Sequence, residues 1–330
     1  MERTAADSHP APRIAVVGPG AVGCLLAASL HRAGFQVALL DHRPDRAARL
    51  AAGLRVEDPG GGRWEAAPAV SADPARLRPR DWIVIAVKQP DTERAAEAAR
   101  ALSAPGALVI SLQNGLGHEA VLARAFAPER VVLGVTAQGA TLVGEGRVRH
   151  AGRGETRIGP LSPEEMPAAG LAPLAAAFSR AGWPTRVEAD IRPLVWRKLL
   201  VNVGINAVTA LTGLPNGALL DHPETRRLQE LAVEEARRVA GALGVPLGLT
   251  PEAAAELVQD VCRRTAANLS SMLQDRLRGR DTEVEAINGA VVRLGCEAGV
   301  PTPVNEVLCH LVTIQSRLGH PPPGRPAPPA

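Results

Sequence analysis

The sequence predicts two domains, an α/β domain with a parallel sheet and an all-α domain after it. Residues 13–40 read as a strand, a glycine-rich turn, a helix and a second strand, a β-α-β unit of about 30 residues. The strand expected at 82–87 shows no alternation of polar and apolar residues, which is typical of a sheet covered on both faces. From Asp190 onwards every long segment has a helical period. We therefore expect the domain boundary near residues 188–190.

The first domain is expected to span residues 13–188 and to alternate strands with helices, as a mostly parallel sheet requires. A turn-rich segment around residues 58–62, compatible with a hairpin, follows the β-α-β unit. Beyond the strand at 82–87, the expected elements are a helix at 91–102, a strand at 107–112, a helix at 118–126, a strand at 130–135, short antiparallel strands within 138–159, a helix at 167–180 and a strand at 184–187.

The second domain is expected to span residues 189–318 and to be entirely helical. Its expected helices are 190–212, 221–243, 251–265, 281–299 and 303–317. Residues 1–12 are expected to form a disordered lead, and residues 319–330 a disordered tail because they are rich in proline.

Composition restricts the classes of function. A net charge of +3 and 2% aromatic residues argue against a nucleic-acid-binding protein. The four cysteines form no C-x-x-C pair, which argues against a zinc site or a disulfide framework and for a reducing compartment. The first 12 residues lack the apolar core of a signal peptide, and we find no run of about 18 apolar residues. We therefore expect a cytoplasmic protein with no metal and no membrane span.

A Gly-Pro-Gly-Ala-Val-Gly motif lies between the first strand and the first helix, where a G-x-G-x-x-G dinucleotide-binding motif belongs. Its first glycine permits the tight turn, its second allows the backbone to approach a diphosphate, and its third allows close packing of helix on strand. The helix N-terminus then faces the phosphates. The expected cofactor-binding residues are Gly18, Pro19, Gly20, Ala21, Val22 and Gly23.

The residues after the second strand give conflicting signals about the cofactor. Asp41 stands about 20 residues beyond the motif, where an acid binds the ribose 2′-hydroxyl of NAD. Arg43 and Arg46 follow it and could bind the 2′-phosphate of NADP. A plain turn cap is the alternative for Asp41.

Lysine is scarce: of 37 Lys and Arg residues only Lys88 and Lys198 are Lys. Lysine can release its proton, whereas arginine stays charged. The two lysines are therefore candidates for a functional role, such as proton transfer, that arginine cannot fill. Lys88 follows the strand ending at Val87, and Asn114 follows the strand ending near Leu112. Ligands of parallel sheets bind beyond the carboxyl ends of strands. The alternative for Asn114 is the turn chemistry of an Asn-Gly pair.

Lys198, Asn202 and Asn206 are four residues apart in a largely apolar segment, so on a helix they form one stripe. Burying such groups without partners costs about 1–3 kcal/mol each, which indicates a functional site if the stripe is buried. The alternative is a solvated face, which normally carries Glu and Arg instead. Further along, Ser and Asn at 268–271 are compatible with a helix cap. Glu283 is compatible with an early acid that offsets the helix dipole.

Taken in order, these motifs resemble ketopantoate reductase (2-dehydropantoate 2-reductase) over roughly residues 13–318. The matching elements are G-x-G-x-x-G, Val87-Lys88, Gln113-Asn114-Gly115, W-R-K-x-x-x-N-x-x-x-N at 196–206, Asn268-x-Ser270-Ser271-Met272 and Thr282-Glu283-x-x-x-Ile287-Asn288-Gly289. The resemblance implies a Rossmann domain, then a helical domain like that of 6-phosphogluconate dehydrogenases, with the substrate in the cleft between them.

By position, the resemblance assigns a role to each matching residue. Lys198 matches the catalytic lysine, and Glu283 and Lys88 match positions near the cofactor and the reacting centre. Asn114 matches a residue that touches both cofactor and substrate, and Ala140 a backbone contact to the cofactor. The positions that match substrate contacts are Asn202, Asn206, Asn216, Asn268 and Ser271.

The implied reaction is the NADPH-dependent reduction of the C2 ketone of 2-dehydropantoate to (R)-pantoate, on the path to pantothenate. NADH is the alternative cofactor, since NADPH-specific members usually carry a basic residue where this chain has Asp41. We expect a small 2-oxo acid as the only partner besides the cofactor, and a monomer or a homodimer. A reductase of another 2-oxo acid and a non-catalytic NAD(P)-sensing protein are the rival hypotheses.

Overall fold

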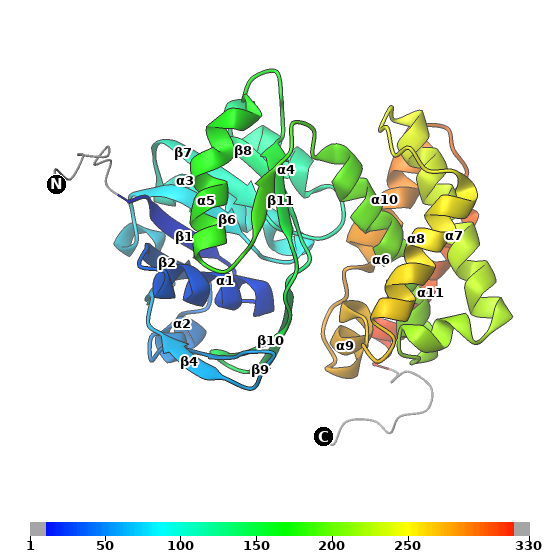
Figure 1. The fold of residues 1–330 in the computed structure, drawn as a ribbon, viewed down its shortest axis with the longest axis horizontal. Helices are drawn as coiled ribbons and strands as arrows, with labels where there is room; N and C mark the ends of the chain where they lie inside the picture. Colours follow the sequence, from blue (N-terminus) through cyan, green and yellow to red (C-terminus); the bar gives the residue numbers. More distant parts are fainter. Residues whose placement is uncertain (1–10, 320–330) are drawn as a thin grey trace, which may run out of the picture. The chain divides into compact units, whose positions relative to one another are not determined.

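The computed structural model describes residues 11–319, and the chain forms two compact units (Figure 1). The first takes in the chain up to Gln113 together with His118–Ile191, and the second takes in Asn114–Gly117 and the chain from Arg192 onwards. The predicted fold class, α/β followed by all-α, is confirmed. The short segment Asn114–Gly117, which the sequence assigns to the first domain, lies instead with the helical unit. The predicted disordered ends fall almost entirely outside the described residues.

The α/β unit alternates strands and helices as predicted. Its strands are β1 Arg13–Val17, β2 Gln36–Leu40, β3 Leu54–Glu57, β4 Arg63–Ala66, β5 Ala69–Ser71, β6 Arg80–Ile85, β7 Ser103–Ser111, β8 Val131–Thr136, β9 Gly139–Gly144, β10 Arg147–Gly152, β11 Thr156–Pro160 and β12 Thr185–Val187. Its α-helices are α1 Ala21–Arg32, α2 Pro44–Leu50, α3 Thr92–Leu102, α4 His118–Ala125 and α5 Ala172–Arg180.

An eight-stranded sheet organises this unit, in the order β12-β11-β8-β7-β6-β1-β2-β5. The strands from β8 to β5 run parallel, whereas β11 is antiparallel to β8 and parallel to β12. The strand order reverses at β1, which has β2 on one side and β6 on the other. Open α/β sheets bind their ligands beyond the carboxyl ends of the strands at such a reversal.

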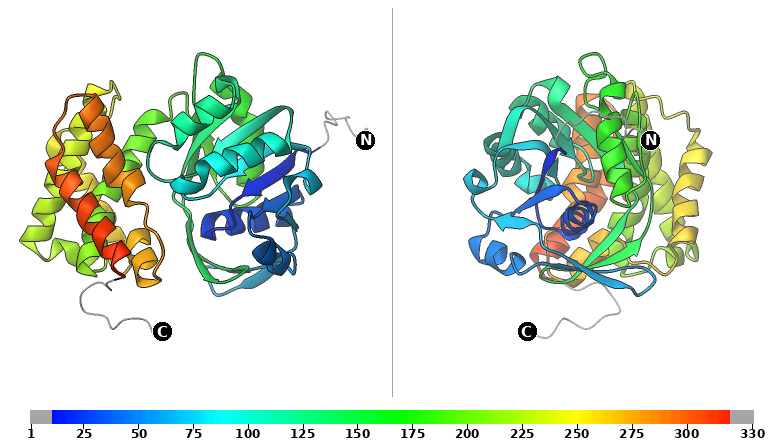
Figure 2. Two further views of the ribbon diagram at one scale, coloured as in Figure 1. Left: turned by 180° about the vertical axis from the view of Figure 1, so that it is seen from behind. Right: turned by 60° about the vertical axis from the view of Figure 1, so that its left-hand side comes forward.

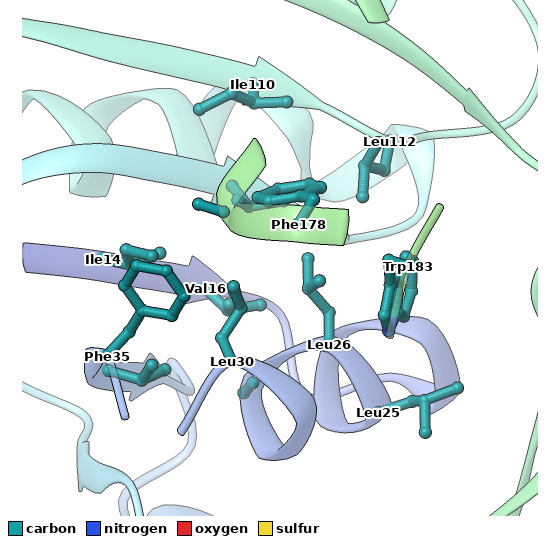
Figure 3. Packing of buried hydrophobic residues seen from close by; sticks show 14 of the residues in the cluster. Ile14, Val16, Leu25, Leu26, Leu30, Phe35, Ile110, Leu112, Phe178 and Trp183 are labelled. Carbon is teal, nitrogen blue, oxygen red and sulfur yellow. The ribbon is translucent and has the colours of Figure 1, made fainter. Parts of the chain in front are cut away.

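Alternate residues of β1 enter two different hydrophobic cores, as a strand covered on both faces requires. Ile14 and Val16 belong to a core with residues of α1 and α5, whereas Ala15 and Val17 belong to one with α3 and α4. Figure 3 shows the first core, where Phe178 and Trp183 pack with Leu26 of α1. Both aromatic side chains are fully buried.

A second sheet of four strands, ordered β4-β3-β10-β9, contains the predicted hairpins. β3 and β4 pair antiparallel across the turn at residues 58–62. β9 and β10 also pair antiparallel.

No helix is predicted from the sequence at α2, and this was wrong. With seven residues, of which only Ala47 and Leu50 are buried, α2 is too short to show a helical period.

The second unit is all helical. Its helices are α6 Arg192–Thr212, α7 Pro223–Ala242, α8 Pro251–Arg264, α9 Ser271–Leu277, α10 Val284–Glu297 and α11 Pro303–Arg317. α6 is its centre, since every other helix of the unit packs against it. By length and composition α6 could cross a membrane, but 61% of its apolar window is buried inside the unit, as in the core helix of a folded domain. α9 is too short and too polar for the sequence analysis to predict it.

Gly204 of α6 allows two helices to pack closely. A Cβ at this position would lie 2.7 Å from Val258 Cγ1 of α8 and 3.0 Å from Val233 Cγ2 of α7. We expect Gly204→Ala to lower the free energy of unfolding by about 1–3 kcal/mol through overpacking. Urea denaturation measures this change.

The matched control is Gly241→Ala in α7, where a Cβ would meet nothing within 4 Å. That variant should gain about 0.5–1 kcal/mol from alanine's better helix propensity. Equal effects of the two substitutions would contradict the packing argument.

Candidate functional site

The glycine-rich turn joins β1 to α1 and has the backbone that the motif predicts. Gly18 has a φ of +103°, which favours glycine, and a Cβ there would lie 2.9 Å from the backbone nitrogen of Val87. A Cβ on Gly23 would lie 2.0 Å from Gly18 O. The first turn of α1 carries no acidic residue, so its positive end remains suited to phosphate.

A cavity of about 200 Å³ opens beside this turn, at the carboxyl ends of β1, β2 and β6. The predicted residues Gly18, Pro19, Gly20 and Lys88 line it. The other lining residues are Val17, Leu40, His42, Arg46, Ala86, Val87, Asp91, Arg94, Ala95 and Ala98. The glycines of the turn, which lack Cβ atoms, the helix N-terminus and the basic side chains fit a dinucleotide diphosphate. Ala21, Val22 and Gly23 form the start of α1 behind the turn.

Asp41, which is buried, and Arg46, which is half-buried, form an ion pair beside the cavity. Asp41 is 1% exposed, and Arg46 donates from Nη2 to Asp41 Oδ1 at 2.8 Å and from Nε to Asp41 Oδ2. Arg46 and His42 line the cavity, whereas Arg43 is exposed and is not among the lining residues. Of the two predicted arginines, Arg46 and not Arg43 therefore lines the cavity.

Four lining residues of α3 and its approach were not predicted from the sequence. Asp91, Arg94, Ala95 and Ala98 stand at helical spacing and line the cavity together, a period that could have indicated them. Ala140, a predicted backbone contact to the cofactor, lies on β9 of the four-stranded sheet and is not among the residues that line this cavity.

The predicted lysine and asparagine stripe lies on α6. Lys198 and Asn202 are half-buried, and Asn206 is buried. One turn further along α6, the Thr209 hydroxyl lies 2.6 Å from that of Ser270, the N-cap of α9. The stripe therefore extends to the segment that holds the second group of predicted substrate residues.

Glu283 stands beside Lys198 at the start of α10, which packs against α6 (Figure 1). Its side chain occupies the N-cap position without capping the helix. Instead, Glu283 Oε2 accepts a hydrogen bond from Asn114 Nδ2 at 3.3 Å. The structure thus brings together three of the predicted site residues, although Asn114 is far from both of the others in the sequence.

Burial lowers the pKa of the Lys198 amine to about 8, and the nearby carboxylate of Glu283 opposes this shift. An ordinary lysine, with a pKa of 10.5, holds its proton too tightly to act as an acid near neutral pH. The environment of Lys198 therefore suits an amine that gives up its proton and regains it.

The remaining predicted substrate residues lie around α9. Asn216 is buried. Its backbone N–H donates to the carbonyl oxygen of Asn268 at 2.9 Å, and its Nδ2 donates to Thr265 Oγ1 at 2.9 Å. Within the described residues, Asn216 Oδ1 is buried and accepts no hydrogen bond. Ser270 Oγ accepts from Leu273 N at 3.1 Å, which confirms a helix cap here. Ser271 and Asn268 are exposed.

The glycine turn on a parallel sheet and the lysine–carboxamide site on a helical unit define a two-domain, nicotinamide-dependent reductase. Comparison with known proteins agrees with this class. Residues 14–163 match the model described as ketopantoate reductase PanE/ApbA, and residues 190–315 match its C-terminal counterpart.

Similar proteins cover nearly the whole chain. A 2-dehydropantoate 2-reductase of Halobacterium salinarum is 43% identical over 310 residues, 93% of this chain and 100% of that protein. The crystal structure of a PanE/ApbA family ketopantoate reductase from Ralstonia eutropha JMP134 is 34% identical, with a TM-score of 0.83 and coverage of 93% and 99%. A ternary complex of D-mandelate dehydrogenase with NADH is 26% identical, with a TM-score of 0.86 and the same coverage. The chain belongs to the ketopantoate reductase family.

Lysine labelled with ¹³C at Cε should report the pKa of Lys198 directly, because the chain has only two lysines. We expect one resonance to titrate with a midpoint of about 8. Glu283→Gln should lower that midpoint, because the carboxylate raises the pKa of the amine. NMR titration of both proteins measures the shift.

Lys88→Arg is the control that leaves a single lysine and so assigns the resonance. Two results would contradict this explanation of the Lys198 pKa. One is a titration midpoint at the ordinary lysine value, and the other is a midpoint that does not change in Glu283→Gln.

Proposed function

We propose that this protein is a 2-dehydropantoate 2-reductase, which reduces the C2 ketone of 2-dehydropantoate to (R)-pantoate with NADPH for pantothenate synthesis. The observation that carries the proposal is the half-buried Lys198, whose pKa is lowered to about 8 beside Glu283. A relative of that name, 43% identical over 93% of this chain, supports the choice of substrate.

The bound nicotinamide supplies a hydride to the ketone carbon. Negative charge then develops on the ketone oxygen, and the Lys198 ammonium stabilises it by a hydrogen bond and delivers the proton. A preorganised donor of this kind contributes about 3–4 kcal/mol to transition-state stabilisation, and proton transfer about 10²–10⁴-fold in rate. Glu283 holds the amine protonated over a wider pH range, because it raises the pKa that burial lowers.

Carboxamides and hydroxyls are the groups we assign to the rest of the substrate. Asn202 and Asn206 continue the stripe on α6 from Lys198, which supports assigning them to the groups that flank the ketone. The 2-oxo acid offers a carboxylate and a hydroxyl, which amide N–H donors and amide oxygens bind without adding charge. We assign supporting contacts to Asn114, Asn216, Asn268 and Ser271.

For the cofactor we propose NADPH, with Arg46 at the 2′-phosphate and NADH as the weaker alternative. Arg46 lines the cavity, and Asp41 is engaged by its guanidinium. We assign the backbone of the glycine turn and Lys88 to the diphosphate side of the same cavity, and Ala140 to a further backbone contact. The four cysteines are free thiols, which suits the cytoplasm that we propose as the location.

A second candidate substrate comes from the similarity to D-mandelate dehydrogenase, a protein of the same fold that was solved with NADH. Under this alternative the chain would reduce a bulkier 2-oxo acid. A panel of 2-dehydropantoate and the 2-oxo acid of mandelate, each with NADPH and NADH, separates the two. Turnover of 2-dehydropantoate with the highest kcat/KM supports the proposal, and a preference for the aromatic 2-oxo acid contradicts it.

Lys198→Ala should lower kcat for 2-dehydropantoate by about 10²–10⁴-fold, because the acid and the charge donor are lost together. Its affinity for NADPH should change little, since Lys198 lies in the helical unit and the glycine turn in the other. Steady-state assay of NADPH oxidation and a fluorescence titration of the cofactor measure the two effects.

Lys198→Arg is the matched control, because it keeps the charge but binds its proton too tightly to serve as the acid. It should recover only part of the lost rate. Wild-type turnover in Lys198→Ala would remove Lys198 from the chemistry, and wild-type turnover in Lys198→Arg would remove its role as the proton donor.

Arg46→Ala should raise KM for NADPH about 10-fold or more, the loss expected for one hydrogen-bonded charge contact of about 1.5–3 kcal/mol. KM for NADH should change much less. Initial-rate kinetics with both cofactors measure the ratio.

Arg43→Ala is the control, since Arg43 is exposed and does not line the cavity. If Arg43→Ala raises KM for NADPH as much as Arg46→Ala does, or more, the 2′-phosphate contact belongs to Arg43.

A further inference from the structure

A second cavity of the α/β unit lies at the end of α1 that is remote from the glycine turn. Its volume is about 350 Å³, and we call it the arginine cavity because Arg32, Arg153 and Arg180 line it. Its walls come from the C-terminal ends of α1 and α5 and from the four-stranded sheet, which α1 (dark blue) contacts along its length (Figure 2). With 12 residues, α1 is about 18 Å long, so this cavity is separate from the one beside the glycine turn.

Two of the three arginines are held by aromatic rings. Arg32 Cζ lies 4.7 Å from the ring centroid of Trp64, and Arg180 Cζ lies 4.1 Å from that of Phe35. Within residues 11–319, no carboxylate lies within 4.0 Å of either guanidinium. Stacking fixes the position of a guanidinium and leaves its N–H donors available. Two positive charges therefore stand in place without counter-ions.

The end of a helix is the alternative explanation for these arginines. Arg32 and Arg180 both stand in the last turn of a helix, where a positive charge is favourable to the helix dipole. That effect accounts for each arginine by itself. It does not require side chains from two different helices to line one cavity together with Arg153, which follows β10 and belongs to no helix.

The remaining charges of the arginine cavity leave an excess of positive charge. Among the described residues that line it, Asp58 is the one acid, 3.8 Å from Arg153. Burial, and then the charge of Arg153, lower the pKa of His150, so this imidazole is neutral near neutral pH. Three guanidinium charges against one carboxylate leave a net of two positive charges.

Ser29 adds a neutral hydrogen-bond donor to the same wall. It is 8% exposed and lines the cavity from α1. Within the part of the chain that the structure describes, its hydroxyl forms no hydrogen bond. A buried hydroxyl without a partner costs free energy, and a ligand that accepts its hydrogen bond removes that cost.

We propose that the arginine cavity binds a small dianion of the phosphate class, either inorganic phosphate or a phosphate monoester. The net charge of the lining matches a dianion, and the planar guanidinium fork matches phosphate oxygens. Small-molecule sites have volumes of about 300–1,000 Å³, a range that includes this cavity. The proposal does not depend on the reaction assigned to the protein, because the site is remote from the glycine turn.

Titration with inorganic phosphate, followed by ¹⁵N NMR of the tryptophan indoles, tests the proposal. The chain has four Trp residues, and Trp64→Phe assigns the resonance of Trp64 in the cavity wall. At constant ionic strength, phosphate should shift this resonance in a saturable way, whereas acetate, a monoanion, should shift it less. Phenyl phosphate distinguishes the two sources: tighter binding than inorganic phosphate indicates a monoester, and equal binding indicates inorganic phosphate.

Arg153→Ala and Arg180→Ala should each raise the Kd for phosphate about 10-fold or more, as expected for the loss of a hydrogen bond to a charged group. Arg149→Ala is the matched control. Arg149 is exposed on β10 and does not line the cavity, so the variant removes the same charge from the opposite face of the sheet. Asp58→Asn should lower the Kd, because it removes the carboxylate from the lining.

Three results would overturn the proposal. The first is a shift of the Trp64 resonance that does not saturate. The second is a Kd that Arg149→Ala raises as much as Arg153→Ala and Arg180→Ala do. The third is loss of phosphate binding in Arg46→Ala, which would place the anion in the cavity beside the glycine turn.

Discussion

The balance of charge and burial at Lys198 is the constraint around which the helical unit is arranged. Removing an ammonium from water favours its neutral form, and a neighbouring carboxylate favours the charged form. In this unit Lys198 lies on α6, where burial desolvates its amine, and the start of α10 supplies the charge of Glu283. The result is a pKa of about 8. Neither helix could set this pKa alone, so it depends on the packing of α10 on α6.

A glycine holds the third component of this site in place. Gly115 has a φ of +78°, and a Cβ there would lie 2.2 Å from Ala286 O of α10. The next residue donates its backbone N–H to the same carbonyl at 2.9 Å. The short segment can therefore lie directly on the first turn of α10, with Asn114 within hydrogen-bonding distance of Glu283. An Asn-Gly pair that reads as an ordinary turn in the sequence has a specific steric reason here.

Much of the fold follows from local patterns, whereas the contacts within the site do not. Period and turn chemistry predict the β-α-β unit, the hairpins and the helices α3 to α8, α10 and α11, because long buried elements repeat their apolar residues regularly. α2 and α9 bury too few side chains to give such a signal. The stripe on α6 was predictable from its spacing. Its pairing with Glu283 rested on resemblance alone, because helix packing brings together residues that no local pattern connects.

The pair of Asp41 and Arg46 shows how an undetected helix changes the interpretation of a motif. In the sequence the acid and the bases after β2 suggest opposite cofactors. In the structure α2 turns Arg46 back onto Asp41, and two of its N–H groups are used there. An arginine has five N–H donors, so three remain beyond these bonds in a side chain that lines the cavity. A neutralised carboxylate repels a phosphate far less than a lone one. An acid after the second strand is therefore compatible with NADPH when a following helix provides its counter-ion.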